Sequence, residues 1–376
     1  MNKLYYILRI KISLFLLFIF LKFKVYSFCA FIIWLNLKKL KKLSVNTHKK
    51  KPKKILVLSK SGGIEDLKET FINKKNYDLN FFWIPRKILK KIHKYCFQEI
   101  IINDYYTKIK NPEFIYRKKL FVDTLFRIFK YLDKFYKFDG IISFNIFYYS
   151  EKYLDEVFLK LNKKFIVIHK ESTFTPIEER CASVVYEKFN DKSSASKISV
   201  YSEKQKNILI KSKIADKKQI VVNGCPRSDF SFKLRSLEPK KNIIVYYLIE
   251  KSRSNNLISK KFSTNWSILY NKTLNWLLEY AKNKPDITLI LKGKTGIHNK
   301  LINKNNFSEN CIFIDGGTGE KLLKNAKVVI AFNSTIVFES ILANRNLIVP
   351  NFNKENIKKK KKIKKIDNSN NYANYK

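Results

Sequence analysis

The stretch that decides the fold runs from residue 328 to residue 350 and reads VVIAFNSTIVFESILANRNLIVP. It opens with a continuous apolar run at 328–332, which is typical of a strand buried on both faces of a parallel sheet. Asn333, Ser334 and Thr335 follow, and each of these side chains can cap the start of a helix. Apolar residues then recur at helical spacing before a second apolar strand. The stretch therefore predicts a β-turn-α-β unit.

The turn of this unit carries small polar side chains where an anion could bind. Ser334 and Thr335 would lie at the N-terminus of the helix, where free backbone N–H groups and the helix dipole favour phosphate. Glu339, one turn after Thr335, would face the same crevice and could accept hydrogen bonds from a ribose or sugar hydroxyl. The alternative is that Ser334 and Thr335 are ordinary caps and that Glu339 is a solvated helix residue.

Length and composition indicate a globular protein with a strong basic excess. The chain has 376 residues, enough for two domains, and 45% of them are hydrophobic, which argues against disorder. The net charge of +45 comes almost entirely from lysine. Lysine, asparagine, isoleucine, phenylalanine and tyrosine are abundant while glycine and proline are scarce, a pattern typical of an AT-rich genome. Because no RNA-binding motif, zinc signature or recognition helix is present, we expect no nucleic-acid partner.

The cysteines indicate a reducing compartment. The chain has five of them, which are scattered, odd in number and form no C-x-x-C motif. This usage predicts buried thiols and neither a disulfide framework nor a metal site.

The N-terminal residues 1–43 predict a hydrophobic, basic helical segment that associates with a membrane. Two apolar runs, 12–21 and 25–37, are separated by Lys22 and Lys24. Neither run reaches the ~20 residues that span a bilayer. Joined, they would place two lysines in hydrocarbon, at about 2.5–3.5 kcal/mol each.

We therefore expect this segment to lie in the membrane interface, and a single tilted span is the alternative. Its cationic residues Lys3, Arg9 and Lys11 and the cluster at 38–42 would contact anionic head groups of the inner membrane. In both cases the rest of the chain would lie on the cytoplasmic face.

A linker at 44–53 leads into a predicted N-terminal Rossmann-like domain, residues 54–238, that would bind the acceptor. Its first strand is followed directly by Ser61, Gly62 and Gly63, a turn that lets backbone approach a ligand closely. Helical patterns alternate with apolar runs in the rest of this half, which indicates a parallel α/β layer. The predicted strands are 54–59, 79–84, 99–103, 140–145, 164–169, 198–201 and 219–222.

His169 and Glu171 are the candidate catalytic residues of this half. They follow a buried strand at its carboxyl end, where open α/β sheets bind their ligands. Either side chain could take a proton from an acceptor hydroxyl, and the alternative is a structural residue that hydrogen-bonds a neighbouring loop. The other three histidines fall in a linker, a lysine-rich helix and a polar loop, at His48, His93 and His298.

The segment from Gly224 to Asp229, Gly-Cys-Pro-Arg-Ser-Asp, follows the last strand of this half. Gly224 and Pro226 would fix a turn from which Arg227 presents a guanidinium fork that suits phosphate. Asp229 would cap the next helix or orient Arg227.

Residues 239–353 predict a second Rossmann-like domain that would bind a nucleotide donor. Lys292, after a late strand, would meet a diphosphate as a point charge, and an ordinary surface lysine is the alternative. The loop with Gly316, Gly317 and Thr318 would lie against the nucleotide. Residues 354–376 predict a disordered lysine- and asparagine-rich tail, and we expect the second domain to be truncated because no closing helix is visible before that tail. The predicted strands are 242–248, 287–291, 311–314, 328–332 and 347–350.

Taken together, these motifs resemble the GT-B superfamily over roughly residues 54–352. More narrowly they are similar to the CDP-glycerol glycerophosphotransferases and to the transferases that build capsule and lipopolysaccharide. The resemblance is carried by Gly-x-Pro-Arg-x-Asp at Gly224 to Asp229, by a lysine after a late strand, and by Asn-Ser-Thr-x3-Glu ending at Glu339. It implies two doubly wound domains that face a cleft, with donor phosphates and sugar held by Ser334, Thr335 and Glu339.

Two departures from these relatives favour a sugar nucleotide over glycerol phosphate. The Lys-x-His-Pro of the relatives is here Lys292-Gly293-Lys294, without the histidine. Their Asp-Tyr-Ser-Ser is here the run from Phe332 to Thr335, Phe-Asn-Ser-Thr.

The resemblance implies an inverting glycosyltransferase that transfers a sugar from a nucleotide-activated donor to an envelope polysaccharide or a lipid-linked glycan. No metal and no other cofactor are expected, because Arg227, Lys292 and the helix N-terminus would stabilise the leaving group. The alternatives are a CDP-glycerol-type glycerophosphotransferase, an enzyme like UDP-GlcNAc 2-epimerase, and an inactive membrane-bound scaffold.

Overall fold

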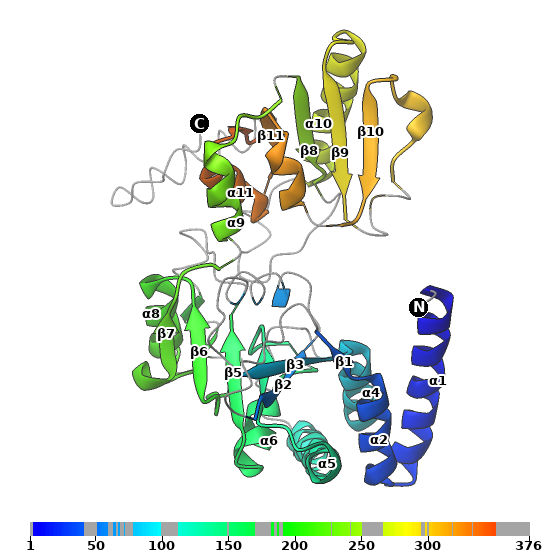
Figure 1. Cartoon of the computed structure of the whole chain (residues 1–376), viewed down its shortest axis with the longest axis vertical. Helices are drawn as coiled ribbons and strands as arrows, with labels where there is room; N and C mark the ends of the chain where they lie inside the picture. The colour runs from blue at the N-terminus through cyan, green and yellow to red at the C-terminus, as the bar shows by residue number, and fades with distance from the viewer. Residues whose placement is uncertain are drawn as a thin grey trace. The chain divides into compact units, whose positions relative to one another are not determined.

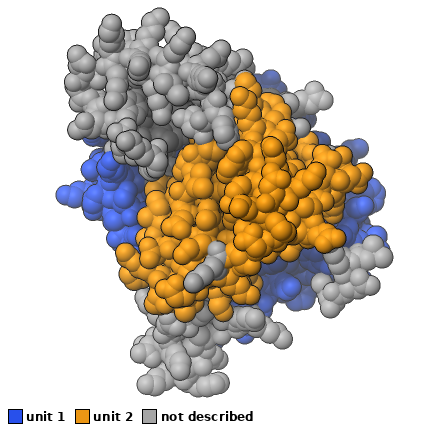
Figure 2. Space-filling view, turned by 90° about the horizontal axis from the view of Figure 1, so that it is seen from above, with its two compact units in different colours: residues 1–227 blue, residues 228–376 orange. Residues whose placement is uncertain are grey.

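The computed structural model divides the chain into two compact units, Met1–Arg227 and Ser228–Lys376 (Figures 1 and 2). Each unit contains its own sheet, so the prediction of two α/β domains built on parallel strands is confirmed. The predicted cleft between the two units stays a prediction. The described residues are 3–40, 51–58, 63–64, 67, 71, 78–98, 112–148, 150–169, 182–183, 186–187, 191–226, 228–240, 242–249, 266–294, 298, 301–317, 319–332 and 334–350.

Unit 1 is built on a sheet with the order β1-β3-β2-β4-β5-β6-β7 among the residues that the structure describes. All neighbours pair in parallel except β1, which is antiparallel to β3. Apolar β-branched runs form these strands as predicted, although the predicted strand at 99–103 lies outside the described residues. The strands are β1 (Lys38–Lys39), β2 (Lys53–Leu58), β3 (Leu79–Ile84), β4 (Gly140–Ser143), β5 (Lys164–Ile168), β6 (Lys197–Val200) and β7 (Ile220–Val222).

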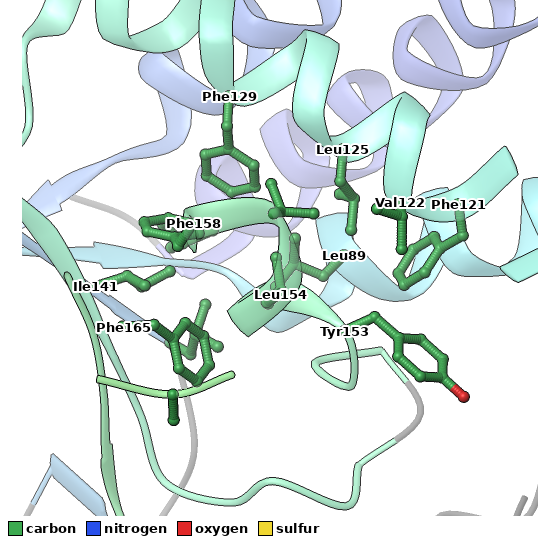
Figure 3. Close-up of a cluster of buried hydrophobic side chains, with 14 of the residues drawn as sticks. Leu89, Phe121, Val122, Leu125, Phe129, Ile141, Tyr153, Leu154, Phe158 and Phe165 are labelled. Atoms are coloured by element: carbon green, nitrogen blue, oxygen red, sulfur yellow. The ribbon is translucent and has the colours of Figure 1, made fainter. Parts of the chain in front are cut away.

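Helices cover this sheet and enclose its main core. The buried face of α5 contributes Phe121, Leu125 and Phe129 to this core, and Phe129 lies near Phe158 of α6, which in turn contacts Phe165 of β5 (Figure 3). Phe129 and Phe158 make an edge-to-face contact at 5.2 Å between ring centroids. The α-helices among the described residues of unit 1 are α1 (Lys3–Lys22), α2 (Tyr26–Asn36), α4 (Arg86–Phe97), α5 (Pro112–Tyr136), α6 (Leu154–Lys160) and α8 (Glu203–Lys211).

The N-terminal helices belong to unit 1 and form no separate segment at 1–43, whereas their association with a membrane stays a prediction. α2 packs against α5, and α1 packs against α2 and α4. The reason is physical: one side of this hairpin is apolar enough to be buried in the main core through Leu17, Leu21, Cys29, Ala30, Ile32 and Ile33.

One further detail of the N-terminal segment differs from expectation. Lys38 and Lys39, assigned to lipid head groups from the sequence, form β1 and pair with Trp83 and Phe82 at the edge of the sheet. Of the helices in the described part of the chain, none combines the length and the hydropathy that crossing a membrane requires.

Unit 2 is built on a five-stranded sheet with the order β10-β9-β8-β11-β12, in which all neighbours pair in parallel. Its long helix α10 (Trp266–Lys282) covers the sheet through Leu269, Tyr270 and Leu277. The strands are β8 (Ile243–Tyr247), β9 (Thr288–Gly293), β10 (Cys311–Asp315), β11 (Val328–Ile330) and β12 (Asn346–Ile348), and α11 (Ile336–Leu342) joins the last two.

The boundary between the units falls at Arg227 and Ser228, earlier than the predicted division at 238 and 239. The short helix α9 (Ser228–Lys233) packs against α11 of unit 2. The guanidinium of Arg345 also donates to the carbonyl oxygens of Leu234 and Leu237, at 3.1 and 2.9 Å. These contacts attach residues 228–238 to the second sheet.

A histidine buried in unit 1 predicts that the protein loses stability in mild acid. The ring of His93 stacks on Phe97 with centroids 4.4 Å apart and meets Phe121 edge to face at 5.2 Å. Burial lowers the pKa of His93 to about 3, from an ordinary value of 6.5. At pH values between these two pKa values, His93 is protonated in the unfolded chain and neutral in the folded chain. The free energy of unfolding therefore falls as the pH drops below 6.5, the pKa of the unfolded state. The contribution of His93 to the free energy of unfolding should decrease by about 2 kcal/mol between pH 7 and pH 5.

Urea denaturation at pH 7 and pH 5 measures this effect, with His93→Phe as the comparison. The variant should lose about 2 kcal/mol less than the wild type on acidification, because it has no proton to take up at this position. Equal losses for the two proteins would show that His93 is protonated in the folded chain.

Candidate functional site

The candidate donor site lies where the strand order of unit 2 reverses. β8 is the first strand of this sheet in the chain, β9 and β10 extend it to one side, and β11 and β12 extend it to the other. In open α/β sheets ligands bind outside the carboxyl ends of the strands at such a switch point. Four sequence-predicted segments lie at or directly after these ends: Lys292, the loop with Gly316 and Gly317, the turn with Ser334 and Thr335, and the helix with Glu339.

Lys292 is a buried cation that holds the glycine loop after β10. It is the penultimate residue of β9 and 7% exposed, so the prediction of a loop residue and the alternative of a surface lysine are both wrong. Its ammonium group donates to the carbonyl oxygen of Gly293 at 2.8 Å and to that of Gly316. Burial lowers the pKa of Lys292, and the nearby carboxylate of Asp315 opposes that effect.

The glycine loop takes a conformation that suits close approach of a ligand. Gly316 and Gly317 have φ angles of +71° and +76°, in the left-handed region that side chains rarely adopt. The N–H of Gly316 also donates to the carbonyl oxygen of Gly293 at 3.2 Å. The ends of β9 and β10 are therefore joined by this backbone hydrogen bond and by the Lys292 ammonium group. The turn above them is open, because a side chain at Gly317 would meet no atom within 4 Å.

Tyr247, at the end of β8, attaches the other end of this loop. Its hydroxyl donates to the carbonyl oxygen of Gly319 at 2.7 Å. A side chain at Gly319 would approach the Tyr247 ring to 3.0 Å, so glycine permits this contact. Burial is the main cause that raises the pKa of Tyr247, and the carboxylate of Glu339 adds to it. Glu339 is 8% exposed, so it is not a solvated helix residue. Its charge acts on Tyr247, the last residue of β8.

The turn before α11 agrees only in part with the expected phosphate seat. Ser334 and Thr335 are exposed at the start of the helix, but the Thr335 side chain makes no capping hydrogen bond. The helix has seven residues, shorter than an ordinary helix with a full dipole. The contribution of this turn to an anion site therefore comes from two exposed hydroxyls more than from the helix.

His298 was placed in a polar loop from the sequence, which gave no sign of its burial. The residue is fully buried beside Gly293, its Nδ1 accepts from the backbone N–H of Lys294 at 3.1 Å, and its Nε2 lies 3.2 Å from the carbonyl oxygen of Ile249. Because Nδ1 accepts, the proton lies on Nε2, which donates to Ile249. The imidazole thus connects the residues after β8 with the residues after β9.

In unit 1, His169 lies directly after β5, as predicted, and is 1% exposed. The amide of Gln205 accepts from the N–H of Tyr201 through its oxygen and therefore directs its nitrogen to His169 Nδ1, at 3.1 Å. Nδ1 is then an acceptor and Nε2 carries the proton. The ring packs edge to face on Phe147 at 5.6 Å. This arrangement makes His169 a hydrogen-bond donor at Nε2 in its neutral form, and its role as a base stays a prediction.

A buried charged cluster in unit 1 was also missed by sequence reasoning. Arg86, the first residue of α4, pairs with Glu151 at 2.7 Å, and the Glu151 side chain is fully buried. Ser143 Oγ donates to the second carboxylate oxygen at 3.0 Å, and the guanidinium lies 4.3 Å from the centre of the Tyr148 ring. These residues come from the carboxyl ends of β3 and β4, the same edge of the sheet as His169. Their distance apart in the sequence hides the pairing.

The remaining predicted site residues divide into described and undescribed ones. Gly63 packs directly on the Phe144 ring, so it serves close packing in the fold. Gly224 has a φ of +73°, as a turn requires, and Asp229 is exposed in the first turn of α9. Outside the described residues lie Ser61, Gly62, Glu171, Arg227, Thr318 and Asn333.

Cysteines and metal ligands give no further site within the described ranges. The thiols of Cys29, Cys96, Cys225 and Cys311 are free, and burial raises the pKa of Cys29 and of Cys96 to about 12. Among the residues that the structure describes, no three histidine, cysteine or acidic side chains gather as metal ligands would.

Comparison with known proteins finds similarity only among solved structures. No model of a protein family matches the chain, and a search of curated proteins finds no relative. The UDP-GlcNAc 2-epimerase from Neisseria meningitidis bound to UDP-GlcNAc is 12% identical with a TM-score of 0.43, over 81% of this chain and 85% of that chain.

Two further structures give similar values. The UDP-N-acetylglucosamine 2-epimerase from Rickettsia bellii is 12% identical with a TM-score of 0.45, over 81% of this chain and 80% of that chain. Arabidopsis thaliana UGT89C1 complexed with quercetin is 12% identical with a TM-score of 0.43, over 82% of this chain and 81% of that chain.

Proposed function

We propose that the chain is a glycosyltransferase whose nucleotide-activated donor binds unit 2 at the switch point between β8 and β11. The observation that carries this proposal is the buried ammonium of Lys292, tied to a loop of glycines at the carboxyl ends of a parallel sheet. A lysine ammonium has three N–H donors, and two of them bond the carbonyl oxygens of Gly293 and Gly316. The third can be directed to a diphosphate oxygen.

Electrostatics supports an anionic ligand at this position. Burial makes the charged form of Lys292 costly, which the lowered pKa expresses. A diphosphate beside the ammonium would offset that cost and raise the pKa again. The same charge would stabilise the nucleoside diphosphate as it leaves, because negative charge grows on the leaving group during transfer. The exposed hydroxyls of Ser334 and Thr335 would add hydrogen bonds to phosphate or sugar oxygens.

Glu339 and Tyr247 would set the position of the sugar or ribose. Glu339 is buried, and its negative charge is close enough to Tyr247 to help raise the pKa of the Tyr247 hydroxyl. A carboxylate at this position can accept hydrogen bonds from two neighbouring hydroxyls of the ligand. Transfer then requires a base for the acceptor hydroxyl, for which Glu171 or His169 is the candidate, and a second phosphate contact from Arg227. The acceptor would be an envelope polysaccharide or a lipid-linked glycan on the cytoplasmic face of the inner membrane.

A panel of donors tests the proposal. Purified full-length protein is heated with UDP-, CMP-, GDP- and CDP-linked sugars and with CDP-glycerol, and the melting temperature is recorded. A donor at 100 times its Kd should stabilise the folded protein by about 2.7 kcal/mol, which raises the melting temperature by several degrees. The donor that raises the melting temperature identifies the nucleobase that the site accepts. A rise with CDP-glycerol and with no other compound would indicate glycerophosphate transfer. If no donor shifted the melting temperature, the inactive scaffold would be favoured. Incubation of the protein with the donor that binds tests the epimerase alternative, because a product with an inverted sugar C2 centre would indicate an epimerase.

A further inference from the structure

One face of α2 is a stripe of large apolar side chains that the described part of unit 1 leaves exposed. Phe28, Phe31, Trp34 and Leu35 recur at helical spacing and are between 40% and 53% exposed. The opposite side of α2 is buried in the unit 1 core, and the helix contains no charged residue. A helix that is apolar on all sides normally has a partner on all sides, so this stripe is a candidate docking surface.

The stripe continues onto α5. Trp34 contacts Phe31 at 5.4 Å between ring centroids and Phe135 edge to face at 6.4 Å, and Phe135 is 50% exposed. Tyr26, at the start of α2, lies 5.5 Å from the guanidinium of Arg127. The two helices therefore run side by side in the same direction. We call the side chains of Phe28, Phe31, Trp34, Leu35 and Phe135 the aromatic face.

Cations lie beside the aromatic face on the same two helices. Arg127, Lys130 and Lys134 recur along the exposed side of α5 and line a groove of about 540 Å³. The one acidic residue of this lining is Asp123, whose carboxylate lies 3.7 Å from the ammonium of Lys160 on α6. We call this the basic groove, and it is lined by Tyr26, Asp123, Phe126, Arg127, Lys130, Tyr131 and Lys134.

The turn between α1 and α2 repeats the same combination. Phe23 is 70% exposed and is flanked in the sequence by Lys22 and Lys24, which are also exposed. Aromatic side chains with neighbouring lysines are favoured at the boundary between hydrocarbon and head groups, where rings enter the acyl region and ammonium groups stay among phosphates. Three separate features of this hairpin and its neighbour α5 therefore match one environment.

We propose that the aromatic face and the basic groove together dock unit 1 on an anionic lipid surface, without crossing it. The rings would enter the interface, and Arg127, Lys130 and Lys134 would bind head-group phosphates. Charge complementarity selects lipid over a second copy of the chain: two basic grooves would repel each other, and a net charge of +45 opposes self-association. The sequence analysis assigned the head-group contacts to Lys3, Arg9, Lys11 and the cluster at 38–42, whereas this proposal assigns them to α5.

This inference goes beyond the proposed function and is independent of it. Both α2 and α5 belong to unit 1, whereas the donor-binding residues belong to unit 2. A variant that loses lipid binding should keep its donor-induced rise in melting temperature, and a protein that binds no donor should still bind lipid. The two proposals can therefore fail separately.

Co-sedimentation of the full-length protein with vesicles tests the proposal. One set of vesicles contains phosphatidylcholine alone, and the other contains phosphatidylglycerol as well. The wild type should sediment with the anionic vesicles, and added potassium chloride should release it. Lys130→Gln with Lys134→Gln should lower the partition coefficient about 30-fold, since each lysine near such a surface contributes about fivefold. Phe31→Ser with Trp34→Ser should abolish detectable binding.

Matched controls come from unit 2. Trp276 and Lys282 are exposed on α10, so Trp276→Ser with Lys282→Gln removes similar side chains away from the proposed surface and should bind vesicles as the wild type does. Far-UV circular dichroism confirms that each variant is folded. Equal binding by both surface variants and the wild type, or no preference of the wild type for anionic vesicles, would overturn the proposal. So would a dimer in sedimentation velocity that Phe31→Ser with Trp34→Ser converts to monomer, because a second copy would then cover the aromatic face.

Discussion

Replacing Lys292 by methionine is expected to weaken donor binding about 100-fold while unit 2 stays folded. The methionine side chain has the length of lysine's four-carbon stem, with sulfur in place of one methylene, and it lacks the ammonium group. Hydrogen bonds to a charged group contribute about 1.5–3 kcal/mol, which corresponds to roughly 10- to 150-fold in affinity. The upper part of that range is expected because Lys292 as a whole residue is 7% exposed, so little water weakens the attraction of its ammonium group for a diphosphate.

Isothermal titration with the donor that stabilises the wild type measures this effect. Lys282→Met serves as the control, because Lys282 is exposed in the last turn of α10. The control should bind donor as the wild type does. Donor affinity of the wild type should also decline at high pH sooner than an ordinary lysine would allow, because the pKa of Lys292 is lowered. If Lys292→Met bound donor with wild-type affinity, the ammonium group would have no part in the site.

The second large effect is expected at the buried ion pair of unit 1. Glu151→Gln should lower the free energy of unfolding by about 3–5 kcal/mol, because the guanidinium of Arg86 would stay buried without its counter-ion. For a unit of this size the loss corresponds to a decrease of about 10 °C in melting temperature. Thermal unfolding followed by circular dichroism measures it.

Two comparisons separate the loss of the pair from the loss of a single contact. Arg86→Met with Glu151→Leu removes both charges and should recover most of the stability, since two apolar side chains leave no charge unpaired. Glu187→Gln breaks an exposed pair with Lys213, whose atoms lie 2.6 Å apart, and should change stability by less than about 1 kcal/mol. A Glu151→Gln protein that melts with the wild type would show that Arg86 is solvated.

The strands were predictable from the sequence because buried parallel strands need continuous apolar runs. The predicted strand at 79–84 coincides with β3, and the run at 164–169 exceeds β5 by one residue. The N-terminal hairpin was not predictable in the same way. An apolar run in α2 reads the same whether it faces lipid or protein, and the packing of α2 against α5 depends on residues a hundred positions later.

Site residues that directly follow a strand in the sequence were predictable. Features that depend on contacts between residues far apart in the sequence were not. Residues directly after strands, such as Lys292 and Gly316, could be placed because parallel strands end at one edge of a sheet. The burial of Lys292 could not, because it depends on the position of the Gly316 carbonyl. The same limit applies to His298, which is buried through contacts with Ile249 and Lys294.

Hydrogen exchange with and without donor tests the central claim most directly, namely that the nucleotide-activated donor binds at the switch point of unit 2. The full-length protein is compared alone and with a saturating nucleotide sugar, and exchange is followed peptide by peptide. Protection should concentrate in peptides that contain 246–249, 292–294, 315–319 and 331–339, and Lys292→Met should abolish it at the same donor concentration. Donor-induced protection confined to unit 1, or its persistence unchanged in Lys292→Met, would contradict the account.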